Sequence, residues 1–548
     1  MSLSQISVNK RDIFISILLT LAVLANPFFL RQEINLFELG LYLPGIDGIV
    51  HGQVPFRDFF YLRGPFELYV PALMMKAFGE HLAVLSVYFY AGTVVLFLAV
   101  ILIARELINS RFLFYALITV EVARTFPRVV YTYWGGMRFA WGMLAILCAV
   151  RFLKTRKISW IAAAGVLSAI GALTSIEIGV ASAAAVCGAL ILEVWAGEKS
   201  FREQISVGAF FFASAAAVVL PYFFYLHLHG ALIAYFDTLH HVTTQMTKTF
   251  LQSEPVPSSL GQVLAAMFNP RHVNFKQMTP LYCLMAFAVY LVFKARRRQL
   301  TPVDAAASAV MFYAFVVYAT GFRNLWANVF EMALQPEKIV LFFLFERILS
   351  YLEIGPWMKK IVDVLIVAIV ISSVVFAFGH FQKRFFAVQW AVKTVTGKNT
   401  KKVIPLAGQE VEKLDLERVK WMTVPKWQAE DLKELDHFFK THTTPGEAVF
   451  MYPELGALHF ILNRPSVGKF PTATLSWIND NWHKELMRRL RENLPRYAVV
   501  NAKTPDYFEK TYFLVEANRR YWQEAMSIIT IHYRPVAQTP TYIIYERR

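Results

Sequence analysis

Long apolar segments separated by short polar ones dominate the first 380 residues of the sequence. Most of them approach the length of about 20 residues that a helix needs to cross a bilayer. The pattern predicts eleven membrane-spanning helices, at about 13–30, 82–104, 112–126, 137–153, 158–174, 178–195, 206–226, 278–294, 302–320, 325–350 and 361–380. The segment at 112–126 fits this pattern least well, because it is short and contains Glu121 and Arg124.

The pattern changes after about residue 383, where charged residues return and no apolar run is long enough to span. Short apolar stretches alternate there with amphipathic ones, which favours an α/β arrangement. We expect helices at Trp427–Thr441 and around Arg488 and Arg491, and strands at Ala448–Tyr452, Tyr497–Asn501, Ile528–Tyr533 and Thr541–Tyr545. The chain is thus predicted to divide into a transmembrane domain, 1–382, and a soluble α/β domain, 383–548.

Composition supports a membrane protein, since 56% of the residues are hydrophobic and 17% are charged, against about 25% charged in soluble proteins. The net charge of +16 could suggest nucleic acid as a partner. Most basic residues, however, lie in short loops between apolar segments, where they set membrane orientation. Their distribution predicts a cytoplasmic N-terminus and, after eleven spans, a C-terminal domain outside the cytoplasm.

Two long polar segments, about 31–81 and 227–277, fall on the outer side in this topology. Within the first, Glu67–Phe78 is too short to span and amphipathic enough to lie along the membrane interface. The second contains the pair His240 and His241, but no recognisable set of metal ligands surrounds it. We therefore expect an amphipathic outer helix there and assign no metal site.

Several arginines lie on the outer side, against the bias of basic residues toward the cytoplasm. A bound anion would explain them, and the planar guanidinium suits a phosphate. Pairing with lipid headgroups or nearby acids is the alternative that stays open. The arginines concerned are Arg57, Arg63, Arg124, Arg128, Arg138 and Arg323.

The first outer segment contains a specific motif, which reads LFELGLYLPGIDGIVHGQVPFRDFFYLRGPFELYVPALMMKAFG from Leu36 to Gly79. It resembles the first outer loop of bacterial GT-C membrane glycosyltransferases related to the protein O-mannosyltransferases and the lipid A aminoarabinose transferase. Phe56 stands where that group commonly has tyrosine. The segment Pro445–Ser466 is similar to the group's C-terminal domain. The positions that match the loop are Gly52, Pro55, Phe56, Arg57, Asp58, Phe59, Phe60, Gly64, Pro65, Tyr69, Lys76, Phe78 and Gly79.

The resemblance implies a GT-C-like, polytopic α-helical protein of the bacterial inner membrane with an extracytoplasmic α/β domain. It also implies an inverting transfer of a sugar from a polyprenyl-phosphate donor to a lipid, glycan or protein acceptor. No cofactor follows with certainty, and a divalent cation stays open. Two other functions remain as alternatives. One is a transporter or flippase of lipid-linked sugars, although the sequence lacks the internal repeat expected of one. The other is an envelope assembly protein without catalysis.

Such a transfer needs a carboxylate to take the acceptor proton and cations to neutralise the leaving phosphate. The resemblance points to Glu38 as the base, where related enzymes often have aspartate, with Asp47 as the substitute. Asp58 is a third candidate, or it fixes the loop together with its neighbour. Glu177 would bind the sugar or pair with an arginine. The donor phosphate would be bound by Arg57, Arg63, Arg128, Arg138 and Arg323.

Overall fold

The computed structural model describes residues 7–24, 30–125, 136–245, 259–272, 275–321, 335–350, 355–384, 410–472, 475, 477–502, 508–509 and 512–548. The chain forms two compact units. The first unit comprises Met1–Asn26, Phe89–Tyr222 and Val256–Ile404. The second unit comprises Pro27–Tyr88, Phe223–Pro255 and Pro405–Arg548, so the first outer segment and the C-terminal segment belong to the same unit. The domain boundary at residue 382 stays a prediction.

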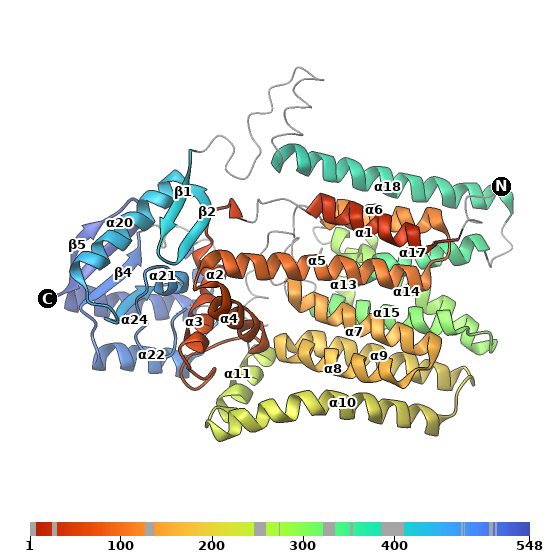
Figure 1. Cartoon of the computed structure of the whole chain (residues 1–548), viewed down its shortest axis with the longest axis horizontal. Coiled ribbons are helices and arrows are strands. Elements are labelled where there is room, and N and C mark those ends of the chain that lie inside the picture. Colours follow the sequence, from red (N-terminus) through yellow and green to blue (C-terminus); the bar gives the residue numbers. More distant parts are fainter. Residues whose placement is uncertain are drawn as a thin grey trace, which may run out of the picture. The chain divides into compact units, whose positions relative to one another are not determined.

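Long helices that run side by side make up the first unit (Figure 1). Every predicted span overlaps a helix in the described part of the chain. These helices are α1 (Lys10–Leu24), α5 (Leu82–Leu107), α6 (Arg111–Thr125), α7 (Gly136–Thr155), α8 (Ile158–Thr174), α9 (Ile176–Trp195), α10 (Phe201–Leu228), α14 (Phe275–Arg296), α15 (Pro302–Gly321), α17 (Gln335–Ser350) and α18 (Pro356–Arg384). The short helix α13 (Leu260–Phe268) adds to them.

Four of these helices are long and apolar enough, by length and composition, to cross a membrane. They are α5, α9, α10 and the stretch Pro302–Thr320 of α15. The helix α8 is also apolar but shorter. The protein is therefore a multi-pass membrane protein, and the number of eleven spans stays a prediction.

Small residues let the helices of the first unit approach closely. A Cβ atom at Gly142 of α7 would lie 1.9 Å from the hydroxyl oxygen of Tyr313 on α15. A Cβ at Gly179 of α9 would lie 2.3 Å from the Cβ of Ala172 on α8. Helices in lipid gain little from burying apolar surface, so such close packing supplies much of their association energy. Any larger side chain at these positions would force the helices apart.

The second unit combines short helices with a small sheet, which confirms the predicted α/β character of the C-terminal segment. Its four-stranded sheet has the order β3-β4-β6-β5, with β3 and β4 parallel and the other neighbours antiparallel, and β1 and β2 form a separate antiparallel pair. The elements are α2 (Leu36–Gly40), α3 (Leu43–Val50), α4 (Phe66–Phe78), α11 (Leu232–Thr244), β1 (Val411–Leu416), β2 (Val419–Pro425), α20 (Lys426–His442), β3 (Val449–Tyr452), α21 (Gly456–Ile461), α22 (Asp480–Glu492), β4 (Tyr497–Asn501), α24 (Glu516–His532), β5 (Tyr533–Gln538) and β6 (Tyr542–Arg547).

The amphipathic segment of the first outer loop forms α4, at nearly the predicted residues. Its buried face carries Glu67, Leu68, Pro71, Ala72 and Met75, which is the spacing of one helix face. Apolar side chains on the other side are exposed, with Leu73 at 66% and Phe78 at 70%. An apolar surface of this kind fits the predicted position at the membrane interface, which stays a prediction.

One predicted element is wrong. Ile528–Tyr533 was expected to be a strand, but α24 continues to His532 and the strand β5 begins only at Tyr533. The apolar run has a helical period, because Tyr521, Ala525, Ile528 and Ile529 are buried at spacings of four, three and one. A short apolar stretch alone cannot distinguish a strand from the buried face of a helix.

Candidate functional site

Glu38 lies on α2, a single helical turn in the first outer segment. Asn35 caps this helix, because its side-chain oxygen accepts a hydrogen bond of 3.1 Å from the Glu38 backbone N–H. The Glu38 residue is only 6% exposed. The sequence predicted a carboxylate on the outer side, and the structure buries it within the second unit.

A partly buried arginine lies near Glu38. The Arg63 guanidinium donates a hydrogen bond to the Tyr42 hydroxyl, and its Nη1 lies 3.8 Å from Glu67 Oε2. The Tyr61 hydroxyl donates to the same Glu67 oxygen at 3.1 Å. Burial works against the Arg63 cation, but the neighbouring Tyr42, Glu67 and Glu38 groups raise its pKa above the ordinary value. This cluster therefore holds a permanent positive charge close to the proposed base.

A second acid from the C-terminal segment, Glu454, also lies near Glu38. It follows the carboxyl end of β3, adopts a positive φ of 58° and is 8% exposed. Burial, and then the negative charge of Glu38, raise the pKa of Glu454 to about 8. Sequence reasoning missed this residue. The one feature that could have indicated Glu454 is its position just after a parallel strand, where ligand sites of α/β sheets often lie.

Glycines explain how α2 and α21 come together. A Cβ at Gly40 would lie 2.8 Å from the backbone nitrogen of Ala457, and a Cβ at Gly456 would lie 2.8 Å from the Gly40 carbonyl oxygen. The Thr472 hydroxyl donates a 3.0 Å hydrogen bond to that carbonyl. Each glycine lies two residues after one of the acids, so this contact fixes the separation of Glu38 and Glu454.

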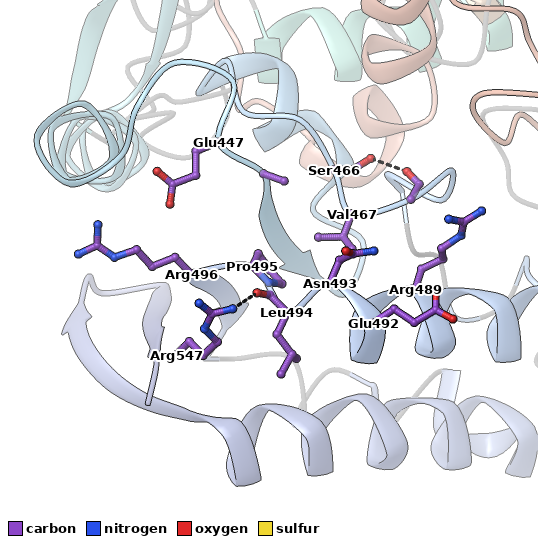
Figure 2. A pocket seen from close by; sticks show the side chains of 12 residues that line it. Glu447, Ser466, Val467, Arg489, Glu492, Asn493, Leu494, Pro495, Arg496 and Arg547 are labelled. Atoms are coloured by element: carbon purple, nitrogen blue, oxygen red, sulfur yellow. Dashed lines mark hydrogen bonds between the residues drawn. The ribbon is translucent and has the colours of Figure 1, made fainter.

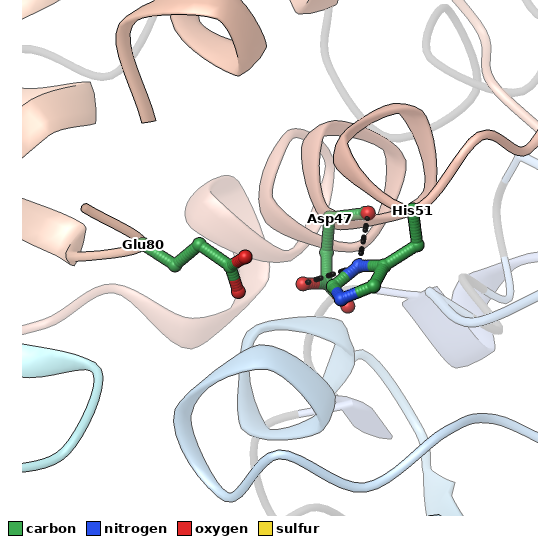
Figure 3. A group of neighbouring side chains, drawn as sticks. All are labelled: Asp47, His51 and Glu80. Carbon is green, nitrogen blue, oxygen red and sulfur yellow. Dashed lines mark hydrogen bonds and ion pairs between the residues drawn. The ribbon is translucent and has the colours of Figure 1, made fainter. Parts of the chain in front are cut away.

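Asp47, the predicted substitute for Glu38, belongs to another cluster. Asp47 and His51 lie on α3, with Glu80 facing them, and their ligand atoms lie within 4.8 Å of one another (Figure 3). This is the one group in the described part of the chain whose spacing could hold a metal ion. Arg418, however, already pairs with Asp47 at 2.7 Å and with Glu80 at 2.8 Å. Its guanidinium supplies the positive charge that a metal would bring.

Asp58 is engaged by its neighbour. Its carboxylate accepts hydrogen bonds from Arg57 Nε at 2.8 Å, from Arg57 Nη2 at 2.7 Å and from the Val54 backbone N–H at 2.8 Å. The last contact closes the loop in which Phe56 has a positive φ of 69°. This geometry matches the alternative in which the pair fixes the loop. Arg57 itself remains 45% exposed at its side chain.

The first unit brings together two other predicted site residues, Arg138 on α7 and Glu177 on α9. Arg138 Nη1 lies 3.5 Å from Glu177 Oε1, and the Arg138 guanidinium lies over the Phe139 ring at 4.8 Å. This is the pairing that the sequence left as the alternative to sugar binding. Arg128 and Arg323, the remaining predicted phosphate ligands, lie outside the described residues.

One histidine of the pair in the second outer segment, His241, is used for packing, whereas His240 is exposed. His241 on α11 is buried, and its Nε2 and the Trp477 carbonyl oxygen are 3.0 Å apart. Its Nδ1 lies 2.9 Å from Gln245 Oε1, and its ring packs edge-on against Trp482. Burial lowers the pKa of His241, which favours the neutral ring. The expected amphipathic helix is present over Leu232–Thr244.

An open hollow of about 540 Å³ lies on the C-terminal segment, lined by three arginines and two glutamates (Figure 2). Two of the arginines already have partners. Arg547 donates to the Leu494 carbonyl oxygen at 2.7 Å, and Arg496 pairs with Glu546 at 3.2 Å. The hollow is thus a polar surface with little unpaired charge, whereas Glu38, Glu454 and Arg63 form a mostly buried cluster of ionisable groups.

Comparison with known proteins identifies the fold. No protein-family model and no curated protein matches the chain. The apo structure of ArnT from Cupriavidus metallidurans is similar, with 10% identity, 97% of each chain covered and a TM-score of 0.53. The structure of the same protein bound to undecaprenyl phosphate gives 12% identity, 98% of each chain covered and a TM-score of 0.54.

The archaeal oligosaccharyltransferase AglB from Archaeoglobus fulgidus, solved with an inhibitory peptide and a dolichol-phosphate, also matches. It has 12% identity and a TM-score of 0.47, over 98% of this chain and 74% of that one. The ArnT likeness extends over nearly the whole of both chains. This confirms the GT-C-like fold and, at the level of fold, the resemblance that the first outer loop indicated.

Proposed function

We propose that this protein is a membrane glycosyltransferase that moves a sugar from a polyprenyl-phosphate donor to an acceptor on the outer face of the membrane. The observation that carries the proposal is the buried cluster in which the Glu38 carboxylate lies near the Arg63 cation. A transferase of this kind needs these two charges close together. The similar fold of an ArnT that binds undecaprenyl phosphate supports the choice of donor.

In the proposed reaction, Glu38 takes the proton of an acceptor hydroxyl or amine as that group attacks the anomeric carbon. A bond forms between the acceptor atom and the anomeric carbon, and the bond from that carbon to the phosphate oxygen breaks. The polyprenyl phosphate leaves with the electron pair, and Arg63 stabilises the negative charge. Attack from the face opposite the phosphate would invert the anomeric configuration.

The other predicted phosphate ligands have secondary parts in this proposal. Arg57 keeps an exposed side chain beside Asp58 and could contact the donor phosphate without leaving its partner. Arg138 contacts Glu177 and would have to exchange that partner for the phosphate or the sugar. Arg63 is therefore the favoured phosphate ligand, because its cation interacts electrostatically with the Glu38 carboxylate, the proposed base.

The decisive experiment is a transfer assay in membranes. A panel of undecaprenyl-phosphate sugars carrying a radiolabel is incubated with membranes with and without the protein, and loss of label from the donor is followed by thin-layer chromatography. We expect Glu38→Gln to reduce transfer by ~10²-fold or more, because the amide cannot accept the proton. Glu38→Asp should keep part of the rate.

Asp58→Asn and Asp47→Asn serve as matched controls, since each also replaces an acid of the first outer segment by its amide. Both variants should retain much more transfer than Glu38→Gln. Near-normal turnover by Glu38→Gln together with loss in either control would move the base along the segment. Absence of transfer by the wild-type protein with every donor would refute the proposed function.

The proposed outer location of the site has its own test. A cytoplasmic N-terminus and an odd number of spans put the C-terminal segment outside. Reporter fusions after Gln299 and after Arg548 should then give opposite compartment signals. Matching signals would contradict the topology but would not affect the assignment of Glu38 as the base.

A further inference from the structure

The acceptor site of the proposed transferase has one acid that the sequence indicated and one that it did not. Glu38 comes from the first outer segment, and Glu454 follows β3 in the C-terminal segment, more than 400 positions later. Both are over nine-tenths buried, at 6% and 8% exposed. Their proximity differs from the surroundings of Asp47 and Glu80, which share Arg418, and of Asp58, which pairs with Arg57.

The backbone shows that Glu454 is held in position. A non-glycine residue with φ of 58° is uncommon and carries strain that neighbouring structure must compensate. That support comes from β3, which pairs in parallel with β4, and from the Gly40–Gly456 contact. Among the described residues, Glu454 Oε1 and the Tyr452 hydroxyl are buried without a hydrogen-bond partner. Buried polar atoms of this kind point to a ligand that would satisfy them.

We infer that Glu454 is an acceptor-binding residue that acts as a neutral carboxylic acid, so that Glu38 alone carries the negative charge in the site. This inference rests on the proposed function. A neutral Glu454 donates a hydrogen bond to a polar group of the acceptor next to the atom that Glu38 deprotonates. An ionised Glu454 would place two negative charges together and could accept hydrogen bonds but not donate them. The molecule that receives the sugar is therefore expected to carry, beside its nucleophile, a group that accepts hydrogen bonds, such as a second hydroxyl.

The electrostatics agree with this geometry. Burial and the Glu38 charge together raise the pKa of Glu454 to about 8, so the group is mostly protonated at neutral pH. The other titratable groups on the elements around α21 are His459 on α21 itself, Tyr452 on β3, and Asp47 and His51 on α3. Arg418 lies over the Phe460 ring, where it is paired with Asp47 and Glu80. Burial keeps His459 neutral, with its pKa lowered to about 4.

The test compares Glu454→Gln with Glu454→Leu in the transfer assay. The amide of glutamine can donate a hydrogen bond without charge, so Glu454→Gln should keep the acceptor KM within about threefold. Glu454→Leu should raise that KM by ~10-fold, because it removes the hydrogen bond. In the wild type the acceptor KM should rise as the pH passes through about 8, and Glu454→Gln should lack this rise.

A residue with only a structural role would change stability in both variants without this pH dependence. An unchanged acceptor KM in Glu454→Leu, or equal loss in both variants, would overturn the inference. The failure of the proposed function looks different, since the wild type would then transfer no label from any donor.

An independent measurement needs no substrate. Infrared spectra of the purified full chain at pH 7 should contain the C=O stretch of a buried neutral carboxylic acid. In difference spectra against the wild type, Glu454→Gln should lose intensity in this band and Asp58→Asn should not. Unchanged intensity in Glu454→Gln would contradict the neutral state of Glu454 whatever the assay gives.

Discussion

Buried acidic side chains have different neighbours in the two units of this protein. In the first unit, each described buried acid contacts a basic side chain or a hydrogen-bond donor. Asp12 lies 2.7 Å from Arg111 and accepts from Tyr115, and Glu193 accepts from Arg156 at 2.9 Å and from Gln204 at 2.8 Å. In the second unit, Glu38 and Glu454 lie near one another, and the charge of one raises the pKa of the other.

The difference separates structural charges from functional ones. Removing a charge from water costs several kcal/mol, and a nearby opposite charge recovers part of that cost. The first unit follows this rule at helix ends, where the pairs stabilise the fold. The second unit departs from it where Glu38 and Glu454 lie near one another, and at Asp431, whose carboxylate oxygens are buried without a hydrogen-bond partner among the described residues. An acid whose pKa is shifted by burial and by a neighbouring acid is the better guide to a site.

The largest expected effect is on transfer activity, and it should separate a functional acid of the second unit from a structural acid of the first. Glu38→Gln should reduce transfer by ~10²-fold, yet change the unfolding temperature by less than about 2 °C. Glu193→Gln in the first unit should have the opposite effect. Transfer per folded molecule should be near normal, and the free energy of unfolding should fall by about 2 kcal/mol, because Arg156 loses its charged partner. Transfer assays and thermal unfolding in detergent would measure both. Equal effects of the two variants on transfer would contradict the distinction.

The sequence predicted the fold class, a helix at each apolar segment and most of the C-terminal elements. These follow from hydrophobic period and length, which are local properties. It could not predict that Glu38 lies near Glu454, because two distant segments meet through Gly40 and Gly456. Nor could it reveal that Arg418 occupies the acid cluster of Asp47, since nothing in the local sequence of Arg418 differs from that of a surface arginine.

A second prediction concerns the cations of the two units. Arg63→Gln should weaken binding of undecaprenyl phosphate by ~10-fold, because a positive charge is lost where the phosphate is expected. Arg156→Gln is the matched control from the first unit, since Arg156 already pairs with Glu193. It should leave donor binding unchanged. Fluorescence quenching or calorimetry with undecaprenyl phosphate would measure both affinities, and equal affinities in the two variants would assign Arg63 to loop structure alone.

A third prediction uses the sign of the Glu454 shift. Its pKa is raised from 4.5 to about 8 in the folded chain, so the folded state holds this proton over a range in which the unfolded chain has lost it. The resulting stability is complete below pH 4.5 and is lost as the pH rises toward 8. The unfolding free energy should fall by about 1 kcal/mol or more across that window. Glu454→Gln should flatten this part of the profile, and an unchanged slope would exclude Glu454 as its source.

The smallest expected effect concerns metal. In the cluster of Asp47, His51 and Glu80, the Arg418 guanidinium pairs with both acids and supplies the charge that a divalent cation would bring. A chelator should therefore change wild-type transfer by less than about twofold, since a bound cation would have to displace an arginine held by two ion pairs. Arg418→Gln removes that guanidinium and leaves two acids and a histidine with ligand spacing. Zn²⁺ should then raise the unfolding temperature of the variant but not that of the wild type. Chelator-sensitive transfer in the wild type, restored by a divalent cation, would reverse this conclusion and identify the cluster as a metal site in which Arg418 is displaced on binding.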